Sequence, residues 1–137
     1  MKRYLVALAS GLCVASQSWA APQCLHYAGA PVALAGKVTL ETFYGPPNYG
    51  ESPETDSRET QAILVLANPI CVSANPSTND EAEKNQLKVT LVPPAGVNLG
   101  SYKGRSVIVK GTLFHAITGH HHTPVLMQVV RVKGGHD

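Results

Sequence analysis

Beyond residue 20, short apolar runs alternate with polar turns along the chain. Val, Ile and Leu are frequent in the runs, and Gly, Pro, Asn and Asp cluster between them, which is typical of an all-β domain. No internal repeat and no coiled-coil period interrupts this pattern. We expect five strands, over residues 31–43, 61–72, 86–92, 105–115 and 123–132.

The first two expected strands differ in burial. In the first, alternating apolar residues are interrupted by Gly36, which favours a bulge or a sharp bend. The second is almost continuously apolar over 62–67, so we expect it to be central and covered on both faces. Pro69 is expected to bend or end it, with Cys71 near its exit.

The third expected strand alternates, and the remaining segments connect the strands. Apolar Leu87, Val89 and Leu91 are expected on one face, with Lys88 and Thr90 on the other. Two polar loops are expected at 45–60 and 73–85, the second with a short helical turn at 80–84, a turn or brief helix at 93–103 and a tight hairpin at 116–122.

Five strands of this spacing, with glycines in the first and fourth, fit a small partly open barrel. The segment 99–113, with Gly104, Val107, Val109 and Gly111, resembles the entry to the fourth strand of an oligonucleotide/oligosaccharide-binding (OB) fold. In that fold a turn or helix separates the third and fourth strands, and the loops between strands 1–2 and 4–5 frame the ligand face. We therefore expect a five-stranded OB-like Greek-key barrel, with a β-sandwich as the alternative.

The first twenty residues have the order of a secretory signal. A basic start at Lys2 and Arg3 is followed by an apolar run over 4–14 and small residues before Ala21. We expect cleavage after Ala20, leaving one domain over 21–137 in the periplasm or outside the cell; an amphipathic first helix or an anchor is the alternative. The apolar run is short of the roughly 20 residues that span a bilayer, so no membrane insertion is expected.

Removal of that segment changes the charge and the cysteine count. Lys and Arg fall from 11 to 9 while Asp and Glu stay at 9, so the formal charge goes from +2 to 0. A neutral surface argues against nucleic-acid binding, which uses clustered Lys and Arg. Cys24 and Cys71 remain, and an exported chain favours one disulfide between them. A metal-bound or an intermolecular pair is the alternative.

The most distinctive feature is a histidine cluster. Four of six histidines fall within eight positions, His115, His120, His121 and His122. In an extended segment His120 and His122 share a face, and His115 could approach it across the hairpin. Three imidazoles suit zinc or copper, which makes His115, His120 and His122 a candidate metal site. Alternatively, the histidines stack, cap turns and bond to backbone without any metal, since their spacing matches no standard zinc signature.

A second candidate recognition element is the loop 43–50, in which Phe43, Tyr44 and Tyr49 surround a Pro-Pro step. Exposed tyrosines on a pre-ordered loop make good contact residues. The alternative is a turn whose rings pack onto the barrel. In an OB-like barrel this loop and the histidine hairpin lie on neighbouring edges of one face.

Catalysis finds no support in the motifs. There is no GxSxG elbow, and the cysteines are expected to be oxidised. A carboxylate pair for glycoside cleavage would come from a polar loop segment, where a solvated surface role is expected. The candidates are Glu41, Glu51, Glu54, Asp56 and Glu59.

Several blocks of the chain resemble one family. They are Cys24-Leu25-x-Tyr27, the loop 43–49, the stretch 68–72 and above all 111–126, which contains Thr-Gly-His-His-His-Thr-Pro-Val-Leu. They resemble a family of small exported bacterial domains of unknown function. The resemblance implies that Cys24 pairs with Cys71, since both lie inside matching blocks. It implies no activity.

The sequence therefore predicts a small exported binding module without catalysis and without a required cofactor. The first hypothesis is an inhibitor- or immunity-type domain that binds a protein in the cell envelope through Tyr44, Tyr49, His115, His120, His121 and His122. The second is a zinc- or copper-binding protein using His115, His120 and His122. The third is an oligosaccharide binder with Tyr44 and Tyr49 as stacking platforms. The oligomeric state is left open.

Overall fold

The computed structural model describes residues 15–16, 21 and 23–134 of the chain. The predicted signal segment and its cleavage site lie almost entirely outside the described residues. The described chain forms strands and one short 3-10 helix: β1 (Leu25–His26), β2 (Val32–Tyr44), β3 (Arg58–Ser73), β4 (Glu83–Val92), η1 (Leu99–Tyr102), β5 (Ser106–His115) and β6 (Val125–Gly134). No helix in this part of the chain is long and apolar enough to cross a membrane.

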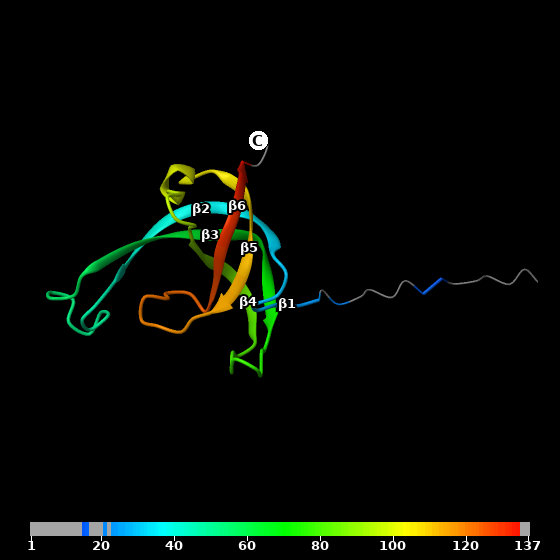
Figure 1. Ribbon diagram of the computed structural model, residues 1–137, viewed down its shortest axis with the longest axis horizontal. Coiled ribbons are helices and arrows are strands. Elements are labelled where there is room, and N and C mark those ends of the chain that lie inside the picture. Colours follow the sequence, from blue (N-terminus) through cyan, green and yellow to red (C-terminus); the bar gives the residue numbers. More distant parts are fainter. Residues whose placement is uncertain (1–14, 17–20, 22, 135–137) are drawn as a thin grey trace, which may run out of the picture.

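Five of the strands close into a barrel (Figure 1). The order is β3-β2-β5-β6-β4, and β4 pairs again with β3 to complete the circle. Within the barrel, neighbouring strands are antiparallel except β4 and β6, which run in parallel. With η1 between the third and fourth barrel strands, this is the expected OB-like Greek-key barrel, and the β-sandwich alternative is wrong.

The strand boundaries differ from the expected ones in several places, and β6 begins and ends two residues later than expected. β2 and β3 extend further toward their connection, pairing as far as Tyr44 with Arg58. β4 begins at Glu83, which pairs with Val72, so the expected helical turn at 80–84 is wrong: the backbone there is drawn into the sheet by β3. β1 was not expected, because its two residues are too short to give a periodic pattern.

Glycine and proline have different roles at the three expected bends. Of the bulge or sharp bend expected at Gly36, the bulge is absent, because β2 shows no register shift there. A Cβ at Gly36 would lie 2.4 Å from the Val65 carbonyl oxygen, and glycine permits this close approach. β5 does shift register against β6 next to Gly111. β3 continues past Pro69, with a register shift between Val65 and Ile70.

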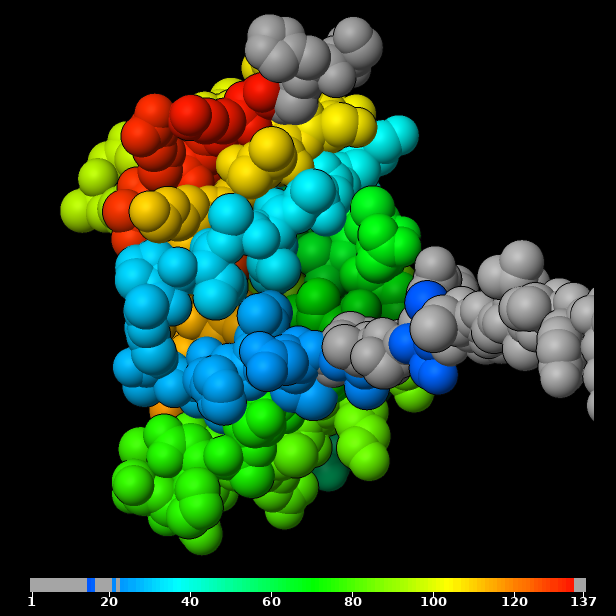
Figure 2. All heavy atoms as spheres, turned by 90° about the vertical axis from the view of Figure 1, so that its right-hand side faces the viewer, coloured from blue at the N-terminus to red at the C-terminus, as the bar shows by residue number. Residues whose placement is uncertain are grey.

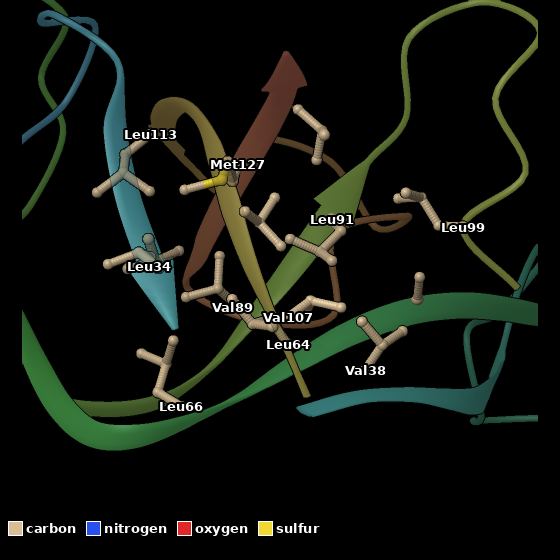
Figure 3. Packing of buried hydrophobic residues seen from close by; sticks show 14 of the residues in the cluster. Leu34, Val38, Leu64, Leu66, Val89, Leu91, Leu99, Val107, Leu113 and Met127 are labelled. Carbon is tan, nitrogen blue, oxygen red and sulfur yellow. The ribbon is translucent and has the colours of Figure 1, made fainter. Parts of the chain in front are cut away.

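The barrel interior is an aliphatic core to which every barrel strand contributes (Figure 3). β3 is buried over Ala62–Leu64 and again at Leu66, but Val65 is partly exposed and Ala67 is exposed, so the expected coverage of 62–67 is only partly correct. On β4 the expected faces are only partly correct: Val89 and Leu91 are buried, but Leu87 is exposed and Thr90 is buried under the segment before β6. Leu99 of η1 joins the core.

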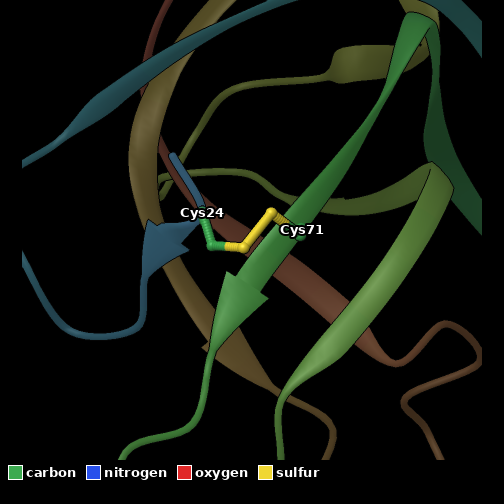
Figure 4. Close-up of a disulfide and its surroundings, with 2 residues drawn as sticks. All are labelled: Cys24 and Cys71. Atoms are coloured by element: carbon green, nitrogen blue, oxygen red, sulfur yellow. A yellow bond between two sulfur atoms is a disulfide. The ribbon is translucent and has the colours of Figure 1, made fainter. Parts of the chain in front are cut away.

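A disulfide attaches the start of the described domain to the barrel wall. Cys24 and Cys71 are bonded at 2.05 Å, which confirms the pairing implied by the sequence (Figure 4). The next residues continue the attachment, because Leu25 pairs in parallel with Val72. The segment around β1 therefore lies across this side of the barrel, as the blue residues in Figure 2 show.

Candidate functional site

Two connections, loop 45–57 between β2 and β3 and loop 116–124 between β5 and β6, lie on the same side of the molecule (Figure 1). Asp56 organises the first of them. Its carboxylate accepts backbone N–H bonds from Asn48 at 2.8 Å, Gly50 at 2.7 Å and Ser52 at 3.3 Å. Asp56 is only 8% exposed, so its expected solvated role is wrong. The loop is folded around a carboxylate.

The hydrogen bonds to Asp56 determine its ionisation. Burial opposes the charged form, but the backbone N–H groups of Gly50, Asn48 and Ser52 together outweigh it and hold the pKa of Asp56 below its usual value. The ionised carboxylate is therefore the form that the folded loop favours.

Glu59, at the start of β3, holds two histidines of loop 116–124. Its Oε1 lies 2.5 Å from Nδ1 of His120 and its Oε2 lies 3.1 Å from Nε2 of His122. Both histidines meet at one carboxylate, although His120 lies in a turn and not in the extended segment that was expected. The pKa of Glu59 is lowered, mainly by the hydrogen bond to His122 and to a smaller extent by the hydrogen bond to His120 and the charges of both rings. Burial opposes this shift.

Loop 116–124 is further fixed to the outer face of the β2–β3 ribbon. The His122 ring stacks on Phe43 with centroids 4.3 Å apart and planes 5° from parallel. The side-chain amide of Gln61 donates to the His120 carbonyl at 2.7 Å. At the end of loop 116–124, the buried hydroxyl of Thr123 forms a hydrogen bond of 2.7 Å with that of Thr90 on β4.

Tyr49 connects the two loops directly. Its hydroxyl lies 3.3 Å from Nε2 of His120, and the two rings meet edge to face at 5.6 Å. Gly119 lies flat against the tyrosine, because a Cβ there would come within 2.7 Å of Tyr49 Cζ. The structure thus brings the predicted tyrosine loop and histidine hairpin into contact.

His121 stabilises its own loop instead of meeting the other histidines at Glu59. Its Nδ1 accepts the backbone N–H of Ile117 at 2.9 Å and that of Thr118 at 3.3 Å, so this nitrogen carries no proton. Burial, and then the charges of His120 and His122, lower the pKa of His121.

His115 lies in a separate environment at the end of β5. Its Nε2 lies 2.9 Å from Oε1 of Glu83, and its Nδ1 lies 3.0 Å from the Ala116 carbonyl. The hydrogen bond to Glu83 raises the pKa of His115 against the opposing effect of burial, with further support from the Ala116 carbonyl. The predicted metal set of His115, His120 and His122 is therefore divided between two carboxylates.

No group of three His, Cys, Asp or Glu side chains in the described part of the chain has a geometry that could hold a metal ion. Zinc or copper binding stays a prediction without structural support.

Sequence comparison gives one family match. Residues 86–133 match the model of a family described as Domain of unknown function (DUF4431). This confirms, over that segment, the resemblance to a family of domains of unknown function. The matching segment contains His115 and the whole of loop 116–124, whereas Tyr49 and Glu59 lie outside it. No curated protein and no solved structure matches the chain.

Tyr44, a predicted contact residue, does not join the two-loop contact. It lies at the end of β2, and the guanidinium carbon of Arg58 is 3.7 Å from its ring centroid. Arg58 thus covers one face of the ring in a cation–π contact, and that face is not free for a sugar.

Asp56 and Glu59 were expected to be solvated surface acids and Glu83 was not singled out, yet all three carboxylates hold parts of the site. Glu59 and Glu83 lie outside the segment that matches the family model and bond to histidines inside it. Asp56 shapes loop 45–57. The register of the β2–β3 hairpin contains the missing signal for Glu59, because Glu59 pairs directly with Phe43. No local motif marks Glu83.

Proposed function

We propose that this protein is an exported, non-catalytic binding module of the cell envelope. In this proposal it docks onto a protein partner, as an inhibitor- or immunity-type domain would, through loops 45–57 and 116–124. The disulfide supports the exported location, because such bonds persist in oxidising compartments.

The observation that carries the proposal is the link from Tyr49 through His120 to Glu59. The Tyr49 hydroxyl lies 3.3 Å from His120 Nε2, and His120 Nδ1 lies 2.5 Å from Oε1 of Glu59 on β3, so both loops are joined to this strand. A surface held in one conformation before binding loses little conformational entropy on association, which favours affinity. Tyr49 is 41% exposed and Ile117 78% exposed on this surface, so large side chains stand free for contact.

The oligosaccharide alternative has less support. Arg58 occupies one face of Tyr44, and Tyr49 meets His120 and Gly119, so the two tyrosines do not form a pair of open stacking platforms. The geometry favours a protein partner that contacts side chains presented by a preformed surface.

Site-specific photocrosslinking in the cells that make the protein tests this proposal. A benzophenone side chain replaces Ile117 in one variant and Val130 in the matched control. Val130 is similarly exposed, at 62%, but lies on β6 outside both loops. We expect a discrete crosslinked protein from position 117 that disappears when His120→Ala is added, and none from position 130. Equal products from both positions, or none from position 117, would contradict the proposal.

A further inference from the structure

A hollow of about 530 Å³ lies between the segment 74–82 and the start of loop 116–124. Figure 1 shows the segment 74–82 at the lower end of the barrel. Tyr27, Asp80, Phe114, His115 and Ile117 contribute to its walls. It borders the proposed docking surface, because Ile117 belongs to both. We call it the Tyr27–Asp80 hollow.

Tyr27 is the first sign of a ligand. The residue is 5% exposed, and among the described residues its hydroxyl has no hydrogen-bond partner. Buried polar groups are almost always paired, and an unpaired one costs about 1–3 kcal/mol. The hydroxyl oxygen is itself buried, so a polar group in the hollow reaches it only when the side chains that cover it shift, and the bond formed then would remove that cost.

The charge around the hollow is the second sign. Asp80 lines it, and Glu83 contacts His115 at its edge. Burial raises the pKa of Tyr27 to about 12, with smaller contributions from the charges of Glu83 and Asp80. His115, which also lines the hollow, is paired with Glu83, and Asp80 is the one carboxylate among the lining residues, so it is the group that would meet an incoming cation.

The surroundings of Asp80 in the hollow favour a lysine ammonium over an arginine guanidinium. Asp80 Oδ2 already accepts the Thr78 hydroxyl at 2.5 Å, so a bidentate arginine fork would have to share that oxygen with the threonine, whereas an ammonium can bind at Oδ1 alone. A lysine ammonium is a compact charge with three donors, which can be shared between Asp80 and the Tyr27 oxygen. Phe114 and Ile117 provide an apolar wall for a methylene stem.

We propose that the Tyr27–Asp80 hollow receives a lysine side chain of the protein partner, with the ammonium at Asp80 and the Tyr27 hydroxyl and the stem against Phe114 and Ile117. This rests on the proposed function, and it names the chemistry of the partner at one point of the surface.

In the test, the isotopically labelled mature protein is titrated with a short peptide whose single charge is one lysine side chain, and the amide resonances are followed by NMR. A matched peptide carries norleucine, which has the stem without the charge. We expect the lysine peptide to shift amide resonances around the hollow at millimolar concentrations and the norleucine peptide to leave them unchanged. Asp80→Asn is expected to weaken lysine binding about tenfold, the worth of a charged hydrogen bond. The control Glu81→Gln removes a neighbouring exposed acid and should bind normally.

A second variant separates binding from folding. Tyr27→Phe deletes an unpaired hydroxyl, so we expect an intact fold of equal or higher stability but weaker lysine binding. Equal binding of the two peptides, equal binding by the Asp80 and Glu81 variants, or full binding by Tyr27→Phe would overturn the proposal.

Two further outcomes locate a failure. If a benzophenone at the exposed position 54 of loop 45–57, outside the hollow, crosslinks the partner equally well in Asp80→Asn, the partner docks without a lysine in the hollow and the proposed function stays intact. If butylammonium binds the hollow as tightly as the lysine peptide while the crosslink persists in Asp80→Asn, the hollow is a site for small amines. That result would overturn the proposal that the amine comes from a lysine of the protein partner.

Discussion

Tyr49 and His120 are 71 positions apart in the sequence, yet the Tyr49 hydroxyl lies 3.3 Å from His120 Nε2. Because His120 Nδ1 faces the Glu59 carboxylate, the proton belongs on Nδ1, and Nε2 accepts from the tyrosine. One imidazole thereby links two loops and a strand, and its surroundings can be changed without touching the ring itself.

Gly119→Ala is expected to separate the two loops. The new Cβ would lie 2.7 Å from Tyr49 Cζ, so the ring must move and lose its bond to His120. We expect faster amide hydrogen exchange in both loops and a stability loss of about 1 kcal/mol or less, as for one exposed hydrogen bond. The control Gly29→Ala adds a Cβ whose nearest neighbour is 3.7 Å away and should behave as wild type. Unchanged exchange in loop 45–57 would show that Gly119 does not position Tyr49.

Asp56→Asn is expected to loosen loop 45–57 and to change acid unfolding. The pKa of Asp56 is lowered from 3.8 and that of Glu59 from 4.5, so their stabilising contribution is present above these values and is lost as pH falls through the folded-state pKa values. Urea midpoints between neutral pH and about pH 2 should fall less steeply in Asp56→Asn than in wild type. Glu54→Gln, an exposed acid of the same loop, is the control. Identical profiles for all three proteins would contradict this role of Asp56.

His115 and His121 are expected to titrate on opposite sides of 6.5. The pKa of His115 is raised and that of His121 lowered, as two-dimensional NMR of the ring protons can measure. The His115 contribution to stability is present below 6.5 and lost as pH rises through its folded-state pKa, whereas the His121 contribution is present above 6.5 and lost as pH falls. Glu83→Gln should lower the pKa of His115 and leave that of His121 in place. Equal pKa values in wild type would refute both environments.

Replacing both cysteines by serine is expected to lower the free energy of unfolding by about 4 kcal/mol, the chain-entropy value for a loop of this length. The separation is 47 positions. Urea unfolding with oxidised wild type alongside measures the difference, and reduced wild type should resemble the variant. A loss below about 1 kcal/mol would mean that the β1–β3 pairing alone retains the segment.

The fold was predictable where the pattern is local. Runs such as 62–67 and the alternation around Val89 and Leu91 mark central strands, and their spacing indicated the barrel. Strand ends were less predictable. Tyr44 and Arg58 pair through backbone hydrogen bonding, which the side-chain pattern does not encode. β1 has only two residues, and it lies beside Val72 next to the disulfide of Cys24 with Cys71.

The candidate site was predictable on one side only. The clustering of His120 and His122 indicated a shared orientation, but their partner Glu59 comes from a strand about sixty positions earlier. His115 is close to them in sequence, yet at the end of β5 it binds Glu83 instead. Proximity along the chain grouped three histidines that tertiary pairing separates.

The parallel pairing of β4 with β6 has a consequence for the family-matching segment. Residues 86–133 include these strands and β5, but not β2 and β3, which complete the circle. Cut out alone, the segment would be an open three-stranded sheet with unpaired backbone along β4 and along β5, and side chains that face β2 and β3 in the barrel would meet water. The segment that matches the family model is thus an incomplete folding unit, and the two strands that complete it carry Tyr44, Glu59 and the attachment of the tyrosine loop.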